Sequence, residues 1–259
     1  KGSRHSRDRS EASPYHQVLL AQNMTGYKNL IAMVTKANLE GFYYKPRIDR
    51  ELLEEHNEGI IALSGCPSGD FLSRLLEGDR DGAIEVAKWY RERFEGRYYL
   101  EVMEHNIERF SAMNPLIADI GRELDIPVLA TNDGHFTNPE EVEGHEVLLC
   151  IGTNATMDQE KRFKLDGDGY HLRSTEEMQA LFPENPEFIS NTMRVAESCD
   201  LELKFDRQLL PEPLIPEGRE SAEYLAELCR TGLEKRLGNI TPELQERLDG
   251  VLESHEEDT

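Results

Sequence analysis

Short apolar runs alternate with amphipathic stretches over roughly the first 150 residues of the chain. Four such runs, each bounded by polar or turn-forming residues, predict buried strands within HQVLLAQN (16–23), EGIIALSG (58–65), RYYLEVME (97–104) and IPVLATN (126–132). Between the runs, apolar residues recur at helical spacing. The predicted helices cover 24 to about 37, 51–56 after an Asp49 N-cap, 69–78, 81–94, 108–124 with an interruption at Pro115, and 138–149 from the Asn138-Pro139 start.

This alternation predicts βαβ units, and therefore an α/β fold with a parallel sheet or barrel. The rhythm changes later in the chain, where three prolines within 209–218 predict a linker and two further helices are expected over 221–238 and 241–253. We therefore expect a first domain at 1–208, a Pro-rich linker at 209–220 and the start of a second domain at 221–259.

Composition narrows the classes of function. The 259 residues include 29 Lys and Arg against 51 Asp and Glu, a net charge of −22 that repels phosphate backbones. No apolar run approaches the roughly 18 residues of a membrane span, and no signal peptide is visible. The cysteines form no CxxC pair, so neither a disulfide framework nor a zinc finger is implied. A reduced, cytoplasmic location without a membrane partner is expected. Because the chain begins at Lys1 without an initiator Met, we also expect a fragment.

Two residues with metal-binding chemistry follow the last predicted strand. Asp133 and His135 come directly after IPVLATN and, two residues apart in an extended chain, point to the same face. A carboxylate and an imidazole at the carboxyl end of a barrel strand favour a divalent metal. An Asx turn beside an exposed histidine fits the same residues, and such short motifs often match by chance.

Two other predicted strands also end in residues of this kind. Cys66 follows EGIIALSG, where a thiolate suits zinc, and a buried structural cysteine is the alternative. Glu101, Glu104 and His105 mark the end of the third strand. They are candidates for supporting a metal site or facing a substrate, and a solvated loop is the alternative.

Seven segments carry a resemblance to a known family: YHQVLLAQN, GYKNLI, LEGFYYKPRID, EGIIALSGCPSG, ATNDGHF, HEVLLCIGT and LLPEPLIPEG. In this order they resemble the N-terminal region of the bacterial replicative DNA polymerase III alpha subunits, the C-family polymerases. The resemblance runs from about residue 2 to 237, and LEGFYYKPRID and SGCPSG are its most specific parts. It implies a polymerase-and-histidinol-phosphatase (PHP) domain, a distorted (β/α)7 barrel incomplete at its N-terminus here, followed by the first helices of a polymerase palm or core region.

The resemblance also implies a metal site. Strand ends in this family bind a cluster of up to three metal ions, with zinc or manganese expected here, and the family's ligand positions fall on His16, Cys66, Asp133 and His135. His16 rests on the resemblance alone. The family's other ligand motifs lie upstream of this segment, and its palm aspartates, which use Mg²⁺, lie downstream. We therefore expect no catalytic residue for polymerisation in this segment.

The function that the resemblance implies is that of a DNA-directed DNA polymerase, a nucleotidyltransferase of chromosomal replication. The parent subunit would act on DNA and deoxynucleoside triphosphates and bind a sliding clamp and a proofreading exonuclease subunit. This segment would contribute a metal-binding domain with a structural or 3′–5′ proofreading role. Two alternatives stay open: a stand-alone PHP phosphoesterase, and a non-catalytic scaffold that docks a proofreading exonuclease. The predicted linker and terminal helices favour the polymerase segment over the phosphoesterase.

The net charge leads to a first testable prediction. Because −22 opposes a polyanion, this chain by itself should bind duplex DNA negligibly at about 0.15 M salt. A gel-shift titration measures this directly. A sub-micromolar affinity at that salt would show that a local basic patch outweighs the overall charge.

Overall fold

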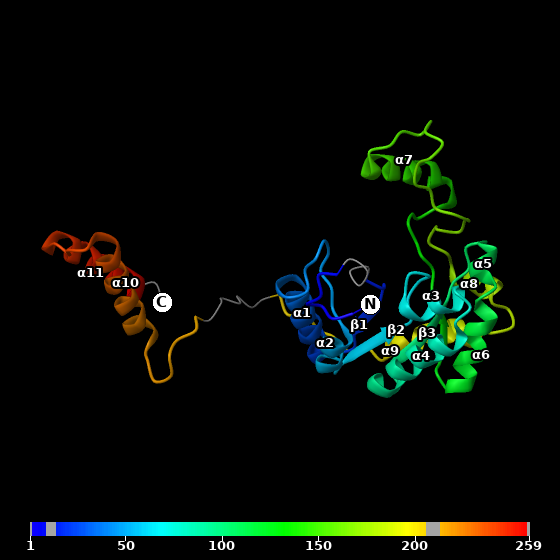
Figure 1. Ribbon diagram of the computed structural model, residues 1–259, viewed down its shortest axis with the longest axis horizontal. Coiled ribbons are helices and arrows are strands. Elements are labelled where there is room, and N and C mark those ends of the chain that lie inside the picture. The colour runs from blue at the N-terminus through cyan, green and yellow to red at the C-terminus, as the bar shows by residue number, and fades with distance from the viewer. Residues whose placement is uncertain (1, 9–13, 206–212, 258–259) are drawn as a thin grey trace. The chain divides into compact units, whose positions relative to one another are not determined.

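The computed structural model describes residues 2–8, 14–205 and 213–257 of the chain (Figure 1). These residues divide into two compact units, Lys1–Leu203 and Lys204–Thr259. The domain boundary expected at 208/209 and the first part of the predicted linker lie within 206–212, outside the described residues. None of the helices in the described ranges is long and apolar enough to cross a membrane.

The first unit combines a sheet with helices, as the alternation predicted. Its strands are β1 (Val18–Ala21), β2 (Ile60–Leu63), β3 (Tyr98–Val102) and β4 (Val128–Ala130). Its helices are α1 (Met24–Leu39), α2 (Arg50–Glu55), α3 (Asp70–Leu76), α4 (Arg80–Phe94), α5 (Glu108–Ser111), α6 (Asn114–Leu124), the 3₁₀ turn η1 (Pro139–Glu141), α7 (Val142–Thr153), α8 (Thr175–Leu181) and α9 (Glu187–Glu197). The second unit contains α10 (Ser221–Leu237) and α11 (Pro242–Glu257).

Local signals in the sequence place most helix starts. The side chain of Asn23 accepts a hydrogen bond from the Gly26 N–H at the start of α1, and Asp49 accepts one from Leu52 at the start of α2, as an N-cap should. Pro115 occupies the first turn of α6, so the predicted 108–124 helix is divided into α5 and α6. The hydrophobic pattern of the sequence predicted neither α8 nor α9.

The sheet has the strand order β1-β2-β3-β4. Strand β1 pairs with β2 in antiparallel fashion, whereas β2, β3 and β4 run parallel. The carboxyl ends of the three parallel strands therefore lie along one edge, together with the amino end of β1. This mixed α/β arrangement confirms the predicted fold class and agrees with part of a β/α barrel.

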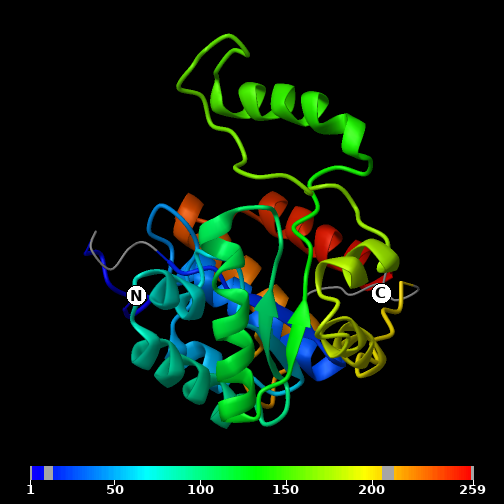
Figure 2. The same cartoon turned by 90° about the vertical axis from the view of Figure 1, so that its right-hand side faces the viewer.

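Alternate strand residues face two apolar layers. Leu100 and its neighbours at even positions of β3 pack against α4 and α6, in a large core that includes Phe94 and Ile120. Tyr99, on the opposite face, packs in a smaller cluster with Leu63 and with Val195 of α9. Figure 2 shows α4 and α6 on one side of the strands and α9 on the other. The strand ends are thus held between two covering layers.

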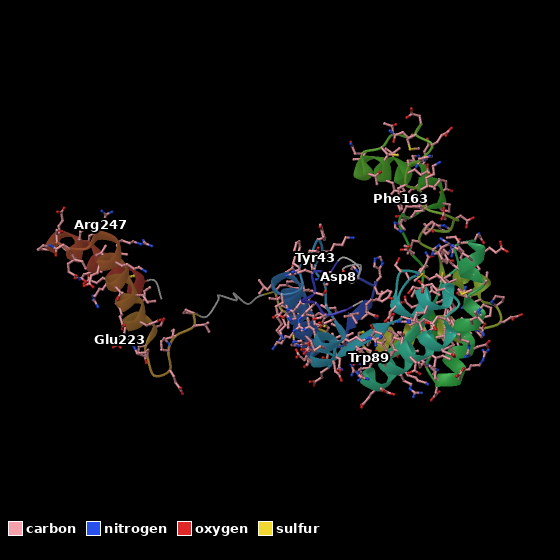
Figure 3. All side chains as sticks on the ribbon, viewed as in Figure 1. Asp8, Tyr43, Trp89, Phe163, Glu223 and Arg247 are labelled. Atoms are coloured by element: carbon pink, nitrogen blue, oxygen red, sulfur yellow. The ribbon has the colours of Figure 1, made fainter. Side chains whose placement is uncertain are left out.

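Trp89 joins α4 to α2 at the surface of the first unit (Figure 3). The guanidinium groups of Arg50 and Arg93 lie 4.8 and 4.7 Å from the centre of its ring, within cation–π distance. The tryptophan is half-buried against the large core. The tryptophan therefore has a packing role between the two helices.

The core position of Leu100 yields a second prediction. Leu100 is fully buried, so Leu100→Ala should lower the free energy of unfolding of the first unit by about 2–5 kcal/mol, through lost burial and a residual cavity. Leu39→Ala is the matched control, because Leu39 is 80% exposed at the end of α1, and it should change stability by only about 0.5 kcal/mol or less. Urea titration compares the two; equal losses would contradict the assigned core.

Candidate metal centre

The antiparallel pairing of β1 with β2 brings His16 beside Cys66. Val18 pairs with Leu63, so two residues farther out His16 stands opposite Gly65. The Nδ1 atom of His16 lies 3.3 Å from the Cys66 Sγ atom. Gly65 adopts φ +81°, and a Cβ there would approach the His16 carbonyl oxygen to 3.2 Å. A glycine at this position therefore allows both the turn and the close approach of the two segments.

Asp133 and His135 form a second pair, beyond the end of β4. The Nε2 atom of His135 lies 3.3 Å from a carboxylate oxygen of Asp133, so the expected approach of these side chains is present. The His135 backbone N–H donates to the carbonyl of Tyr170 at 2.7 Å. This contact ties the strand-end segment to a part of the chain 35 residues away in sequence.

Tyr170 connects this second pair to His105. Its ring stacks on the His105 imidazole with centroids 4.3 Å apart and meets the His135 ring edge-on at 5.6 Å. The Nδ1 of His105 lies 3.1 Å from the Asp168 carbonyl oxygen, which makes Nδ1 the protonated nitrogen. Burial lowers the pKa of His105, and its Nε2 has no hydrogen-bond partner among the described residues. His105 thus presents a neutral imidazole near Asp133.

Glu101 lies between the two pairs, at the end of β3. Its side chain, only 3% exposed, accepts a hydrogen bond from the Gly65 N–H and another from the Thr131 hydroxyl at 3.1 Å. Burial raises the pKa of the Glu101 carboxyl, and these two hydrogen bonds act in the opposite direction. Glu104, by contrast, accepts hydrogen bonds from its own loop, including the Ser111 hydroxyl at 2.7 Å, and so stabilises that loop.

The donor set fits a metal ion in its chemistry. Two imidazoles, a thiol and a carboxylate are ligands that zinc takes, and imidazole and carboxylate also suit manganese. The structure arranges His16 with Cys66 and Asp133 with His135 as two separate pairs. Within the described ranges, no three His, Cys, Asp or Glu side chains converge closely enough to hold one ion. Each pair therefore brings together two candidate donor groups.

Sequence reasoning missed three residues around these pairs. Tyr170 and Thr131 are ordinary residues by local pattern and gain their roles only through contacts with His105, His135 and Glu101. His145 lies on α7, and its ring centroid lies 5.1 Å from that of His135. The residues next to Tyr170 and His145 in the sequence do not specify these partners.

One known protein family is similar to the first part of this chain. The PHP domain family matches residues 3–105, a range that includes His16, Cys66 and Glu101. The family match agrees with the predicted fold and points to metal binding in general, although the match ends before Asp133 and His135.

The chain is also similar to several curated proteins. It is 39% identical to the DNA polymerase III subunit alpha of Treponema pallidum over 92% of this chain and 21% of that protein. The proteins of the same name from Deinococcus radiodurans (39% identity, 91% of this chain, 18% of the relative) and Thermus aquaticus (37%, 86% and 19%) are similar over nearly the same range. The chain spans about a fifth of the length of these relatives.

The buried carboxylate of Glu101 gives a third prediction. Because its pKa is raised on folding, its contribution to stability is fully present below the ordinary value of 4.5 and is lost as the pH rises through the raised pKa. Glu101→Gln is neutral at every pH, so it should gain stability relative to wild type at about pH 8 compared with about pH 4. Urea unfolding at the two pH values, with chelator present, measures the difference.

Glu92→Gln serves as the control, because Glu92 is exposed on α4 and its replacement removes the same charge in water. It should show no comparable dependence on pH. If Glu101→Gln behaved as Glu92→Gln does, the Glu101 carboxyl would not be desolvated in the folded chain.

Proposed function

We propose that this chain is the PHP segment of a bacterial DNA polymerase III alpha subunit and serves in it as a metal-binding domain. The observation that carries this proposal is the similarity to proteins of that name over about nine tenths of the chain. In this proposal the parent protein is a cytoplasmic DNA-directed DNA polymerase, which takes DNA and deoxynucleoside triphosphates and uses Mg²⁺ at its own active site. A sliding clamp and a proofreading exonuclease are its proposed partners.

We further propose zinc or manganese as the metal of this segment, with His16, Cys66, Asp133 and His135 as ligands. The support is their common location along one sheet edge, where β1 begins and β2 and β4 end. A bound divalent ion would supply a Lewis acid for phosphoester chemistry, or a rigid crosslink between strand ends in a structural role. The thiol of Cys66 favours zinc of the two metals.

Contacts within the chain hold the candidate ligands and His105 in place along this edge. The His16–Cys66 pair sits on a turn that Gly65 makes tight, and the Asp133–His135 pair is held through the Tyr170 backbone. The imidazole of His105 is held by the Asp168 carbonyl and stacks on the Tyr170 ring, and its Nε2 atom has no hydrogen-bond partner among the described residues. Such hydrogen bonds from the far nitrogen of a histidine orient imidazoles in metal sites.

The fourth prediction tests the ligand assignment. Cys66→Ser and Asp133→Asn should each weaken zinc binding at least tenfold, a loss of about 1.4 kcal/mol or more, because each removes one donor from a small set. Isothermal titration of the chain with zinc measures the affinities. Cys199→Ser is the matched control: its thiol donates to the Val195 carbonyl on α9, away from the strand ends, and its loss should leave the affinity unchanged.

Retention of full affinity in Cys66→Ser would remove that residue from the site. Absence of zinc and manganese binding by the wild-type chain would refute the proposal that this segment is a metal-binding domain by itself.

A further inference from the structure

Glu101 is an unusual group for the interior of this sheet. The buried residues next to it on β3, Leu100 and Val102, are apolar, whereas Glu101 places a carboxylate where water does not reach. None of the ion pairs in the described part of the chain includes Glu101. A buried carboxylate without a cation lowers stability, so its presence calls for a role beyond packing.

The hydrogen bonds of Glu101 join three strand ends. One carboxylate oxygen accepts from the Gly65 N–H after β2, and the other accepts from the Thr131 hydroxyl after β4. The backbone N–H of Glu101 itself donates to the Ser64 hydroxyl at 2.8 Å. One side chain thus contacts segments 36 and 30 residues away in sequence.

Both contacts lie one or two residues before a candidate ligand. Gly65 precedes Cys66 directly, and Thr131 precedes Asp133 by two residues. Alternation along β3 puts Glu101 on the same face as Tyr99, in the layer that contains Leu63 and Leu129. The carboxylate therefore lies on this face of the sheet, at the ends of the strands that lead to Cys66 and Asp133.

We propose that Glu101 is the positioning residue of the metal centre: it holds the Cys66 turn and the Thr131–His135 segment in register with each other and supplies an uncompensated negative charge that favours a cation there. This inference rests on the proposed metal-binding function for its second part only. The first part, the anchoring of the turn, concerns the metal-free chain. Hydrogen bonds that support ligands in this way commonly change metal affinity by about 10- to 100-fold when removed.

Two variants separate anchoring from charge. Glu101→Gln keeps an oxygen to accept from the Gly65 N–H and an amide that can donate to the Thr131 hydroxyl, but it removes the charge. Glu101→Ala removes both. Thr131→Val deletes only the contact to the β4 segment. Zinc affinity by isothermal titration and hydrogen exchange of the Gly65 amide are measured for each variant on the whole chain.

The expected pattern distinguishes the roles. Gly65 exchange should accelerate at least tenfold in Glu101→Ala and stay near wild type in Glu101→Gln, whereas zinc affinity should fall at least tenfold in both. Thr131→Val should weaken zinc binding without changing Gly65 exchange. The amide of Ile61, in the middle of β2, should exchange at the same rate in all variants and reports that the sheet is intact.

Three outcomes would overturn parts of the inference. Unchanged Gly65 exchange in Glu101→Ala would refute the anchoring role. Wild-type zinc affinity in Glu101→Gln would refute the role of the charge. If the wild-type chain bound no zinc, the metal-binding function would fail, and Gly65 exchange would still decide whether Glu101 anchors the turn.

Discussion

Strands β1 and β2 run in opposite directions, and Val18 lies opposite Leu63. This register carries His16 to the same edge at which the parallel strands β2, β3 and β4 end. A slip by one residue would turn the side chains of β1 to the other face of the sheet and separate His16 from Cys66. The position of His16 relative to the other candidate ligands depends on this pairing.

Buried polar side chains at the strand ends lie next to well-packed apolar side chains along the strands. Below the edge, Leu63 and Leu129 pack in one layer and Leu100 and Val102 in the other, so the strands are rigid supports. At the edge, Glu101 and His105 are buried and carry polar atoms that no apolar layer can satisfy. Proteins tolerate such groups where function requires them, and the loss of stability is offset by the core below.

The acidic character of the chain opposes the binding of DNA but favours the binding of cations. A net charge of −22 opposes binding of DNA by this segment itself, although its relatives are named DNA polymerase III subunit alpha. The same negative charge favours cations. We propose that the buried carboxylate of Glu101 supplies part of it at the strand ends. A metal-binding module and a DNA-binding surface thus make opposite electrostatic demands, which a long protein can meet in separate regions.

The sequence by itself determined the features that depend on neighbours within a few residues. Short apolar runs located the strands and helical spacing located the first helices. Asp49 marked a helix start, and the two-residue spacing of Asp133 and His135 predicted their shared face. The PHP resemblance was also visible, because motifs such as SGCPSG are contiguous.

Only the tertiary structure decided which residues meet. It grouped the four predicted ligands as two pairs, placed Tyr170 between His105 and His135, and set Glu101 across two strand ends. Apart from the Asp133–His135 pair, these contacts join segments from 30 to more than 60 residues apart, and they arise from strand register and loop closure. Local periodicity contains no information about such distances, because it records only which face of its own helix or strand a side chain occupies.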